Sequence, residues 1–401
     1  TNASGGGNAT TLVEGNSSVL IDGDVTIEDG ALIGGSQAKA GNGTQPKATA
    51  TVKGNSSVTV NNGTLAGVIG GGIAETYYYS TTVTAESIVE GTSSVTINGG
   101  KVTGNSIVTG AVQNNTGTLS AAIVGGGLAN DKGSTATVGS TRVTIADGTI
   151  NGKVVAGGAA VNGGSSTVTH DTSLTMTDGK VDGDLIGGGF VDMNNATDNV
   201  ANVDGSTHIT VSGGSLVDAE IIGGGSVRNA NGAANVTGDT HVTVTKYAND
   251  QVDQKWVQYV LGGGKAMTNG TQTATANVAG NTNVIIGEQG ATGEALKIEF
   301  GTVAGGGLAR AQKAGDTATA NVDNNANVTV HSGILSGVAG GGIAESYSNG
   351  TAKATVTNAN LTINGGTING VEYKGVNTDK VKVAVLGGGI AKGAEATANA
   401  T

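Results

Sequence analysis

The chain has 401 residues and a formal net charge of −11, with 73 glycines, one proline, no cysteine and 2% aromatic residues. The absence of cysteine excludes a disulfide framework, a thiol nucleophile and a cysteine-ligated zinc site. The 20 lysines and arginines are spread thinly along the chain, which argues against a nucleic-acid partner, because such a partner requires a basic stripe.

Neither end of the sequence has the features of a targeting segment or of a folded terminus. The first ten residues are polar, and no apolar run approaches the ~20 residues of a membrane-spanning helix. Both ends lie inside a repeat and lack an atypical polar cap. We therefore expect that the sequence is part of a longer protein or has lost a targeting segment.

A run of glycines that follows an apolar residue recurs from one end of the chain to the other. Copies of this motif lie at 33–35, 69–74, 124–129, 156–158, 186–189, 222–225, 261–266, 303–309, 339–344 and 386–391. Consecutive glycines are costly to order, so their repetition needs a geometric reason. We expect each run to be a corner with unusual φ and ψ angles, stacked about 4.8 Å from the next corner.

Between corners, three short strands and three turns are predicted. A strand of small alternating residues, such as 317–322, leads to a polar turn of the type Gly54-Asn55-Ser56-Ser57. A second strand follows, in which branched residues flank a threonine that we expect to face water. A third strand, such as 65–69, then runs into the next corner.

The second strands give the period of the repeat. Their first residues are Val19, Val58, Val95, Val143, Leu174, Ile209, Val242, Val284, Val328 and Leu361. The spacing is irregular, because long insertions are predicted in 101–122, 247–260, 288–301 and 371–383. A stacked coil tolerates such insertions where they loop outward.

These elements predict an all-β chain that forms one solenoid domain over residues 1–401. Parallel strands this short need a crossover, and a β-helix provides one by using the next side of the coil. We expect a three-sided, right-handed parallel β-helix of about ten coils, because the irregular strand lengths do not fit the stricter six-residue period of the left-handed form. Both ends of this stretch are expected to be uncapped.

The titratable residues do not indicate a catalytic or metal site. His208 and His241 occupy equivalent positions just before a second strand, and they are expected to be solvated, as are His170 and His331 in adjacent turns. The acidic pairs Asp22/Asp24 and Asp182/Asp184 are interpreted as surface turns, because the longer ligand series of a calcium loop is missing. No acidic cluster repeats from coil to coil, so no enzymatic activity, metal or cofactor is predicted.

Exposed aromatic residues are the candidate binding residues, because tyrosine and tryptophan often anchor sugars and protein partners. A tyrosine run follows one corner, Tyr347 follows another in a closely matching motif, and two more aromatic residues border an insertion. The candidates are Tyr77, Tyr78, Tyr79, Trp256, Tyr259 and Tyr347.

The combination Val-Thr-Val-x-Gly-Gly followed by Leu-x-Gly-x-Val-x-Gly-Gly-Gly resembles the repeats of bacterial autotransporter passengers and related surface adhesins. The resemblance extends over essentially the whole chain and implies export to the bacterial cell surface, a β-helical stalk, and adhesion or self-association. It carries over no catalytic residue, and no C-terminal membrane domain is present in the sequence.

Two functions from different classes follow. In the first, the chain is a non-enzymatic adhesin stalk whose partners are other copies of itself or the glycans and proteins of other cells. In the second, it is a structural subunit whose ends stack into an extracellular filament or surface layer, since exposed strand edges pair readily with another chain. A polysaccharide-active enzyme ranks third, and it requires two close carboxylates on neighbouring coils.

Overall fold

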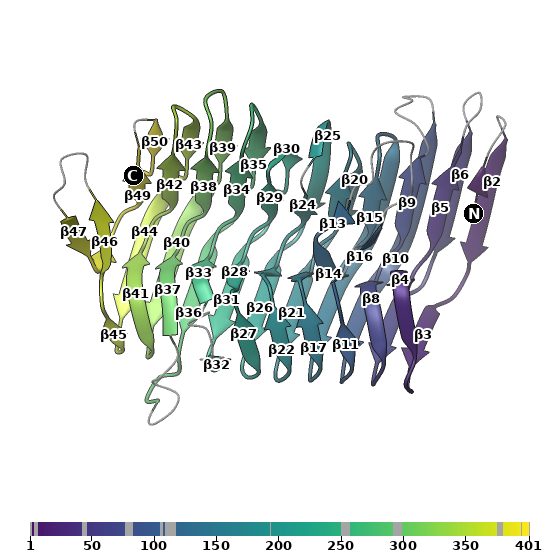
Figure 1. Cartoon of the computed structure of the whole chain (residues 1–401), viewed down its shortest axis with the longest axis horizontal. Coiled ribbons are helices and arrows are strands. Elements are labelled where there is room, and N and C mark those ends of the chain that lie inside the picture. The colour runs from purple at the N-terminus through teal and green to yellow at the C-terminus, as the bar shows by residue number, and fades with distance from the viewer. Residues whose placement is uncertain are drawn as a thin grey trace.

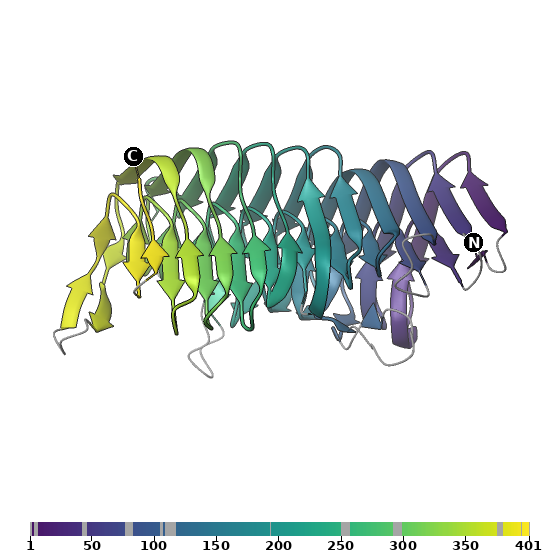
Figure 2. The same ribbon diagram turned by 90° about the horizontal axis from the view of Figure 1, so that it is seen from above.

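The computed structural model describes residues 2–3, 7–41, 46–76, 83–104, 107–108, 118–192, 194–249, 257–291, 299–374, 380–393 and 395–400. Within these ranges every regular element is a strand, and the strands stack in parallel into a long solenoid, as predicted. The two ends of the chain lie at opposite ends of this solenoid (Figures 1 and 2). Over the same ranges, no helix with the length and hydropathy to cross a membrane is found.

Sheet A contains the strand that follows each glycine corner, and each strand pairs in parallel with its equivalent one coil away. Its strands are β1 (Asn2–Ala3), β5 (Gln37–Ala40), β9 (Ile73–Thr76), β15 (Leu128–Asn130), β19 (Ala159–Val161), β24 (Phe190–Val191), β29 (Ser226–Arg228), β34 (Lys265–Thr268), β38 (Leu308–Ala311), β42 (Ile343–Ser346) and β49 (Ile390–Lys392).

Sheet B is bent and contains two parallel ladders, which β10 (Thr84–Ile97) and β16 (Ser134–Ile145) cross without interruption. The first ladder also contains β2 (Asn8–Val13), β6 (Lys47–Val52), β20 (Ser165–Val168), β25 (Asn194–Val203), β30 (Ala230–Ala233), β35 (Thr273–Thr275), β39 (Thr317–Thr319), β43 (Thr351–Lys353) and β50 (Ala396–Thr397). The second also contains β3 (Ser17–Ile21), β7 (Ser56–Val60), β21 (Thr172–Met176), β26 (Thr207–Val211), β31 (Thr240–Val244), β36 (Thr282–Ile286), β40 (Val322–Val330) and β44 (Val356–Ile363).

Sheet C leads from the second ladder of sheet B to the next corner, and in many coils it is split into two pieces. The pieces nearer sheet B are β11 (Lys101–Val102), β17 (Thr149–Asn151), β22 (Lys180–Asp182), β27 (Ser215–Val217), β32 (Ala248–Asn249) and β45 (Thr367–Ile368). Those nearer the corner are β14 (Ala121–Val124), β18 (Lys153–Val155), β23 (Leu185–Ile186), β28 (Glu220–Ile222), β33 (Val257–Leu261) and β48 (Val385–Leu386). The longer strands are β4 (Thr26–Ile33), β8 (Thr64–Ile69), β37 (Glu299–Ala304) and β41 (Ile334–Ala339).

Two antiparallel hairpins depart from this parallel pattern. One pairs β12 (Ile107–Val108) with β13 (Thr118–Leu119), and the other pairs β46 (Val371–Lys374) with β47 (Lys380–Val383). The prediction of three strands per coil is therefore too simple. Three sheets are present, but a coil contains up to five short segments, because sheets B and C each bend.

The predicted period of the repeat is confirmed residue by residue. The ten predicted first residues of the second strands, from Val19 to Leu361, are consecutive partners in one parallel ladder. In this ladder the branched residues are buried while the threonine between them is partly exposed, as for Val58, Thr59 and Val60. The alternation of branched residues and threonine was therefore sufficient to set the register.

The glycine corners stack as predicted, and of the two reasons predicted for glycine the close approach of neighbouring corners is confirmed, whereas no positive φ is found there. The described glycines with positive φ lie mostly in turns, such as Gly63 (101°) and Gly100 (78°), and none belongs to a corner triplet. A Cβ on Gly224 would instead lie 2.7 Å from the backbone nitrogen of Gly264, the equivalent corner one coil along. Glycine is therefore needed at the corner for lack of space, with no requirement for a left-handed backbone.

A buried hydroxyl links each corner to sheet B in eight successive coils. Thr207 Oγ1 donates to the carbonyl of Gly223 at 2.6 Å, and Thr240 Oγ1 donates to that of Gly262 at 2.6 Å. The donors are Ser17, Ser56, Ser93, Thr141, Thr172, Thr207, Thr240 and Thr282. All of these residues except Thr172 were predicted to belong to polar turns, but they lie at the start of the second ladder of sheet B, and all except Ser17 are buried.

The corner divides the interior of each coil into two halves. Between sheets A and B the core is mostly alanine, for example Ala201, Ala274 and Ala318. Between sheet C and the second ladder of sheet B the core contains larger side chains, such as Ile209, Val284 and Leu216. The three glycines lie between these halves, where sheets A and C come closest to sheet B.

Candidate binding face

The outer side of the angle between sheets C and A is here called the corner face. Its floor consists of the apolar residues that flank the glycines, such as Ile186 and Phe190 on either side of one corner. These residues point away from the interior, yet both are fully buried. They belong to one buried apolar cluster with the equivalent residues of neighbouring coils, such as Val155 and Ile222.

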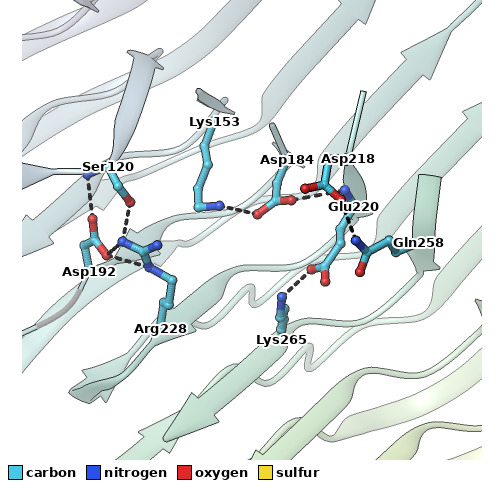
Figure 3. Close-up of polar contacts among 9 residues, drawn as sticks. All are labelled: Ser120, Lys153, Asp184, Asp192, Asp218, Glu220, Arg228, Gln258 and Lys265. Atoms are coloured by element: carbon cyan, nitrogen blue, oxygen red, sulfur yellow. Dashed lines mark hydrogen bonds and ion pairs between the residues drawn. The ribbon is translucent and has the colours of Figure 1, made fainter. Parts of the chain in front are cut away.

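An ion pair across the corner shows that the two walls of this face approach one another, and a second pair lies along the edge of sheet C. Lys265 of sheet A forms an ion pair with Glu220 of sheet C, and both residues are less than one-tenth exposed. Lys153 contacts Asp184 at 2.5 Å, and Asp184 also accepts a hydrogen bond from the backbone of Glu220 at 3.1 Å. Figure 3 shows these side chains lying in a row along neighbouring coils.

A third pair lies beside this row. Arg228 Nε and Nη2 donate to Asp192 Oδ1 at 2.9 and 2.6 Å, and the Asp192 side chain is almost completely buried. The other oxygen of Asp192 accepts the backbone N–H of Ser120 at 2.6 Å (Figure 3). Arg228 Nη2 also donates to Ser120 Oγ. Ser120, which precedes β14 of sheet C, is therefore bonded to residues at the ends of β24 and β29 in sheet A.

These contacts correct one prediction. Asp184 was interpreted as part of a surface turn, but it is 8% exposed and paired with a lysine. Asp184 and Glu220 lie on adjacent coils, with Lys153 and Lys265 as their partners. Each carboxylate has a cationic partner, which suits a group that stabilises the coil stack, since burying an unpaired charge is costly.

A hollow of about 470 Å³ opens farther along the chain and is lined by Arg310, Gln312 and Tyr347. Arg310 Nε donates to Glu345 at 2.6 Å. Lys392 donates to the hydroxyl of Tyr347 at 3.1 Å, and its ammonium group lies 5.2 Å from the centre of the tyrosine ring. Burial lowers the pKa of Arg310, but the nearby Glu345, with Tyr259 and Tyr347, raises it overall.

Two of the six predicted aromatic residues can be placed. Tyr347 is 39% exposed and lines the hollow, and Tyr259 is partly buried on β33 against the floor of the corner face. The electrostatic effect of both on Arg310 places them near the same cation. Tyr77, Tyr78, Tyr79 and Trp256 lie outside the described residues.

The histidines lie on the outer surface of sheet B or in turns. The rings of His208 and His241 stack at 4.7 Å with an angle of 10° between their planes. Both were predicted to lie just before the second strand, but the strands begin two residues earlier than expected, at Thr207 and Thr240, so both histidines lie within the strand and are partners in register. Burial and the proximity of His208 lower the pKa of His241, which favours the neutral ring. His170 is exposed, as predicted, and His331 is partly buried and contacts Asn364 at 3.2 Å.

One oxygen of a buried carboxylate lacks a hydrogen bond among the described residues. Asp131 is 5% exposed, and its Oδ2 has no hydrogen bond. Burial and the nearby Glu75 raise the pKa of Asp131 to about 7. Across the described residues, no group of three or more histidine, aspartate or glutamate side chains is arranged to hold a metal ion.

Comparison of the chain with protein-family models, with curated proteins and with solved structures found no significant match. The function is therefore argued from the residues and their arrangement.

Proposed function

We propose that this chain is part of a secreted bacterial surface protein, in which it forms a non-enzymatic β-solenoid stalk that mediates adhesion or self-association. The observation that supports this most is the position of the insertions. All four long insertions lie between the second ladder of sheet B and the corner-side strand of sheet C. Variation in the chain is therefore concentrated on one edge of a regular scaffold, which is a common arrangement for binding loops.

The scaffold itself is uniform where these insertions are absent. A single residue, Gly152, separates β17 from β18, and only Asp218 and Ala219 separate β27 from β28. By contrast, 18 residues, 103–120, separate β11 from β14, and 16 residues, 369–384, separate β45 from β48. The short links show that the coil closes without an insertion, so the long ones are available for another role.

Repeated polar residues stabilise the length of the scaffold. Besides the buried hydroxyls, the asparagines Asn202, Asn235 and Asn277 form a ladder in which each side-chain oxygen accepts the backbone N–H one coil along at 2.9 to 3.0 Å. The ladder continues through Asn321 to Thr355. Such contacts connect each coil to its neighbour, as a stiff extracellular stalk requires.

The test removes insertions without changing the coil. In one variant, residues 369–384 are replaced by the two-residue link Asp-Ala that joins β27 to β28. In a second variant 103–118 is deleted, so that the buried Leu119 and Ser120, the partner of Asp192, are kept as the two-residue link to β14. Beads coated with each protein are scored for attachment to bacterial and epithelial cells and for clumping with one another, and circular dichroism checks the fold.

We expect the unaltered chain to attach or clump, and at least one shortened variant to lose most of this activity while retaining its β spectrum and melting temperature. Unaltered beads that neither attach nor clump would contradict the proposal. Regular fibres of the chain in electron micrographs, without cell attachment, would favour the filament alternative.

A further inference from the structure

We propose that the hollow lined by Arg310, Gln312 and Tyr347 binds a carboxylated saccharide. The inference rests on the proposed adhesive function and specifies a ligand class for one surface of the stalk. The hollow has a volume of about 470 Å³, which lies within the range of ordinary small-molecule sites. The class of ligand follows from charge, from the exposed ring and from the way the hollow is held rigid.

The charge that lines the hollow is opposite in sign to that of the chain. Among the lining residues Arg310 is the charged one, and Glu345, Lys392 and Asp316 contact the lining residues from outside, whereas the whole chain carries −11. Arg310 uses Nε to hold Glu345, and within the described residues its Nη groups make no hydrogen bond. A guanidinium fixed in this way presents two parallel donors, the geometry that matches a carboxylate.

Tyr347 supplies the flat surface on which a sugar ring can pack. Tyr347 is 39% exposed, and Lys392 contacts its hydroxyl at 3.1 Å. The backbone N–H of Tyr347 donates to Ala311 on the neighbouring coil at 2.8 Å. Because the ring is already held on both sides, little conformational entropy is lost when a ligand packs on it, which favours binding.

A tight turn holds this residue in place. Ser348 and Asn349 directly follow Tyr347 and have φ angles of 49° and 61°. The turn is closed by the Gly350 N–H bonded to the Tyr347 carbonyl at 3.0 Å and by Ser346 Oγ bonded to the Gly350 carbonyl at 2.5 Å. Turns between sheets A and B in other coils also have positive φ, as at Asn162 and Thr271, so this turn is a regular feature of the coil that fixes the position of Tyr347.

Gln312 completes the site on the preceding coil. Its backbone N–H bonds to Asp316 at 3.2 Å, while its side-chain amide makes no hydrogen bond among the described residues. An amide beside a cation and an exposed ring can both donate to and accept from sugar hydroxyls. An acidic peptide would use the cation but has no need of the ring and amide together, so we assign the site to a saccharide.

The test screens the whole chain against an array of uronate-containing and sialic-acid-containing oligosaccharides, together with neutral oligosaccharides and acidic peptides. The strongest glycan is then titrated alongside its carboxyl-reduced form. We expect a carboxylated glycan to bind, and we expect reduction of its carboxyl group to weaken binding at least tenfold. Absence of binding by every carboxylated glycan at millimolar concentration, or binding of acidic peptides alone, would overturn the inference.

Matched variants locate the binding. Tyr347→Ala should weaken binding at least tenfold, while Tyr347→Phe, which keeps the ring, should retain most of it. The double variant Arg310→Gln/Glu345→Gln removes the ion pair without leaving one charge buried alone, and it should abolish the preference for the carboxylate. Lys53→Gln, an exposed lysine paired with Glu14, serves as the control for a lost charge. Equal binding by all of these variants would contradict the site.

The bead assay separates this inference from the proposed function. If the chain binds a carboxylated glycan at this hollow but does not attach to cells or clump, the adhesive function fails and the site stands. If the beads attach and the double variant attaches equally while binding no less glycan, the site fails and the adhesive function stands.

Discussion

The two halves of each coil differ in how much change they can accommodate. In the half between sheets A and B, Ala274 pairs in register with Ala318, and both are fully buried. In the half between sheets B and C, Val284 belongs to a ladder in which equivalent positions hold valine, leucine or isoleucine. The alanine half is limited by space, whereas the branched half varies in side-chain volume, and the glycine corner is the boundary between them.

The largest loss of stability is expected for a substitution at the glycine corner. In Gly224→Ala, the new Cβ would lie 2.7 to 3.0 Å from backbone atoms of Gly263 and Gly264, which a side-chain rotation cannot relieve. We expect a loss of about 3 to 5 kcal/mol in the free energy of unfolding, or failure to fold. Gly23→Ala, where nothing lies within 4 Å, is the control in thermal melts. Equal melting of the two variants would show that the corner has room.

The next prediction compares the stability cost of enlarging a buried side chain in each half of one coil. Ala274→Val and Val284→Ile both enlarge a buried side chain on the same turn of the solenoid. We expect Ala274→Val to cost about 1 to 3 kcal/mol because its neighbours leave no space, and Val284→Ile to cost less than about 1 kcal/mol because Ile209 occupies the equivalent position. Urea titration measures both changes, and a reversed order would break the comparison.

A smaller effect is expected at the hydroxyl that joins the halves. Thr240→Val preserves the shape of the side chain but removes the hydrogen bond to Gly262, leaving a buried carbonyl with one partner fewer. The expected cost is about 1 to 2 kcal/mol in the same urea titration. At the equivalent position of a later coil stands Ala326. Ala326→Thr should stabilise the chain slightly, and a loss of stability there would argue that the hydroxyl is not the reason for threonine.

The smallest effect concerns Asp131, at the end of sheet A in the alanine half. Its pKa is about 7, above the ordinary value of 3.8, so the protonated form is favoured in the folded chain. The stabilisation that comes from the protonated Asp131 carboxyl group is fully present below pH 4 and is lost as the pH rises towards 7.

Asp131→Asn should therefore raise the melting temperature at pH 8 by a few degrees, about 1 kcal/mol, and leave it unchanged at pH 4. Asparagine also accepts the positive φ of 72° found at this position. Melts of the exposed Asp204→Asn variant provide the control, and an equal shift at both pH values would contradict a buried carboxylate.

The branched half was predictable from the sequence because its pattern is local. Alternation of branched residues with threonine, as in Val58-Thr59-Val60, fixes which side chains face inward. The positions of the corners and of the long insertions follow in the same way, since both are read along a few consecutive residues. Handedness, the number of coils and the function remain predictions.

The corner face was not predicted, because its partners come from neighbouring coils at unequal separations. Lys153 and Asp184 are 31 residues apart, whereas Glu220 and Lys265 are 45 apart, so no fixed spacing indicates the pairs. One signal was present: Lys153, Asp184, Glu220 and Tyr259 each stand three residues before a glycine corner, or before Ala156 in the case of Lys153. Aligning the corners would have placed these four residues in one column.

The central claim is that each repeat adds one coil of constant rise, whatever its length in residues. Spin labels on a cysteine-free chain test this directly, with one label at Thr329 and the other at Thr144, Thr96 or Thr59, which lie five, six and seven coils away along one ladder. The account predicts distances of about 24, 29 and 34 Å by electron paramagnetic resonance, in equal steps of about 4.8 Å. These equal steps in distance correspond to unequal numbers of residues, 48 from Thr96 to Thr144 and 37 from Thr59 to Thr96. Unequal steps, or distances that do not increase along the series, would contradict it.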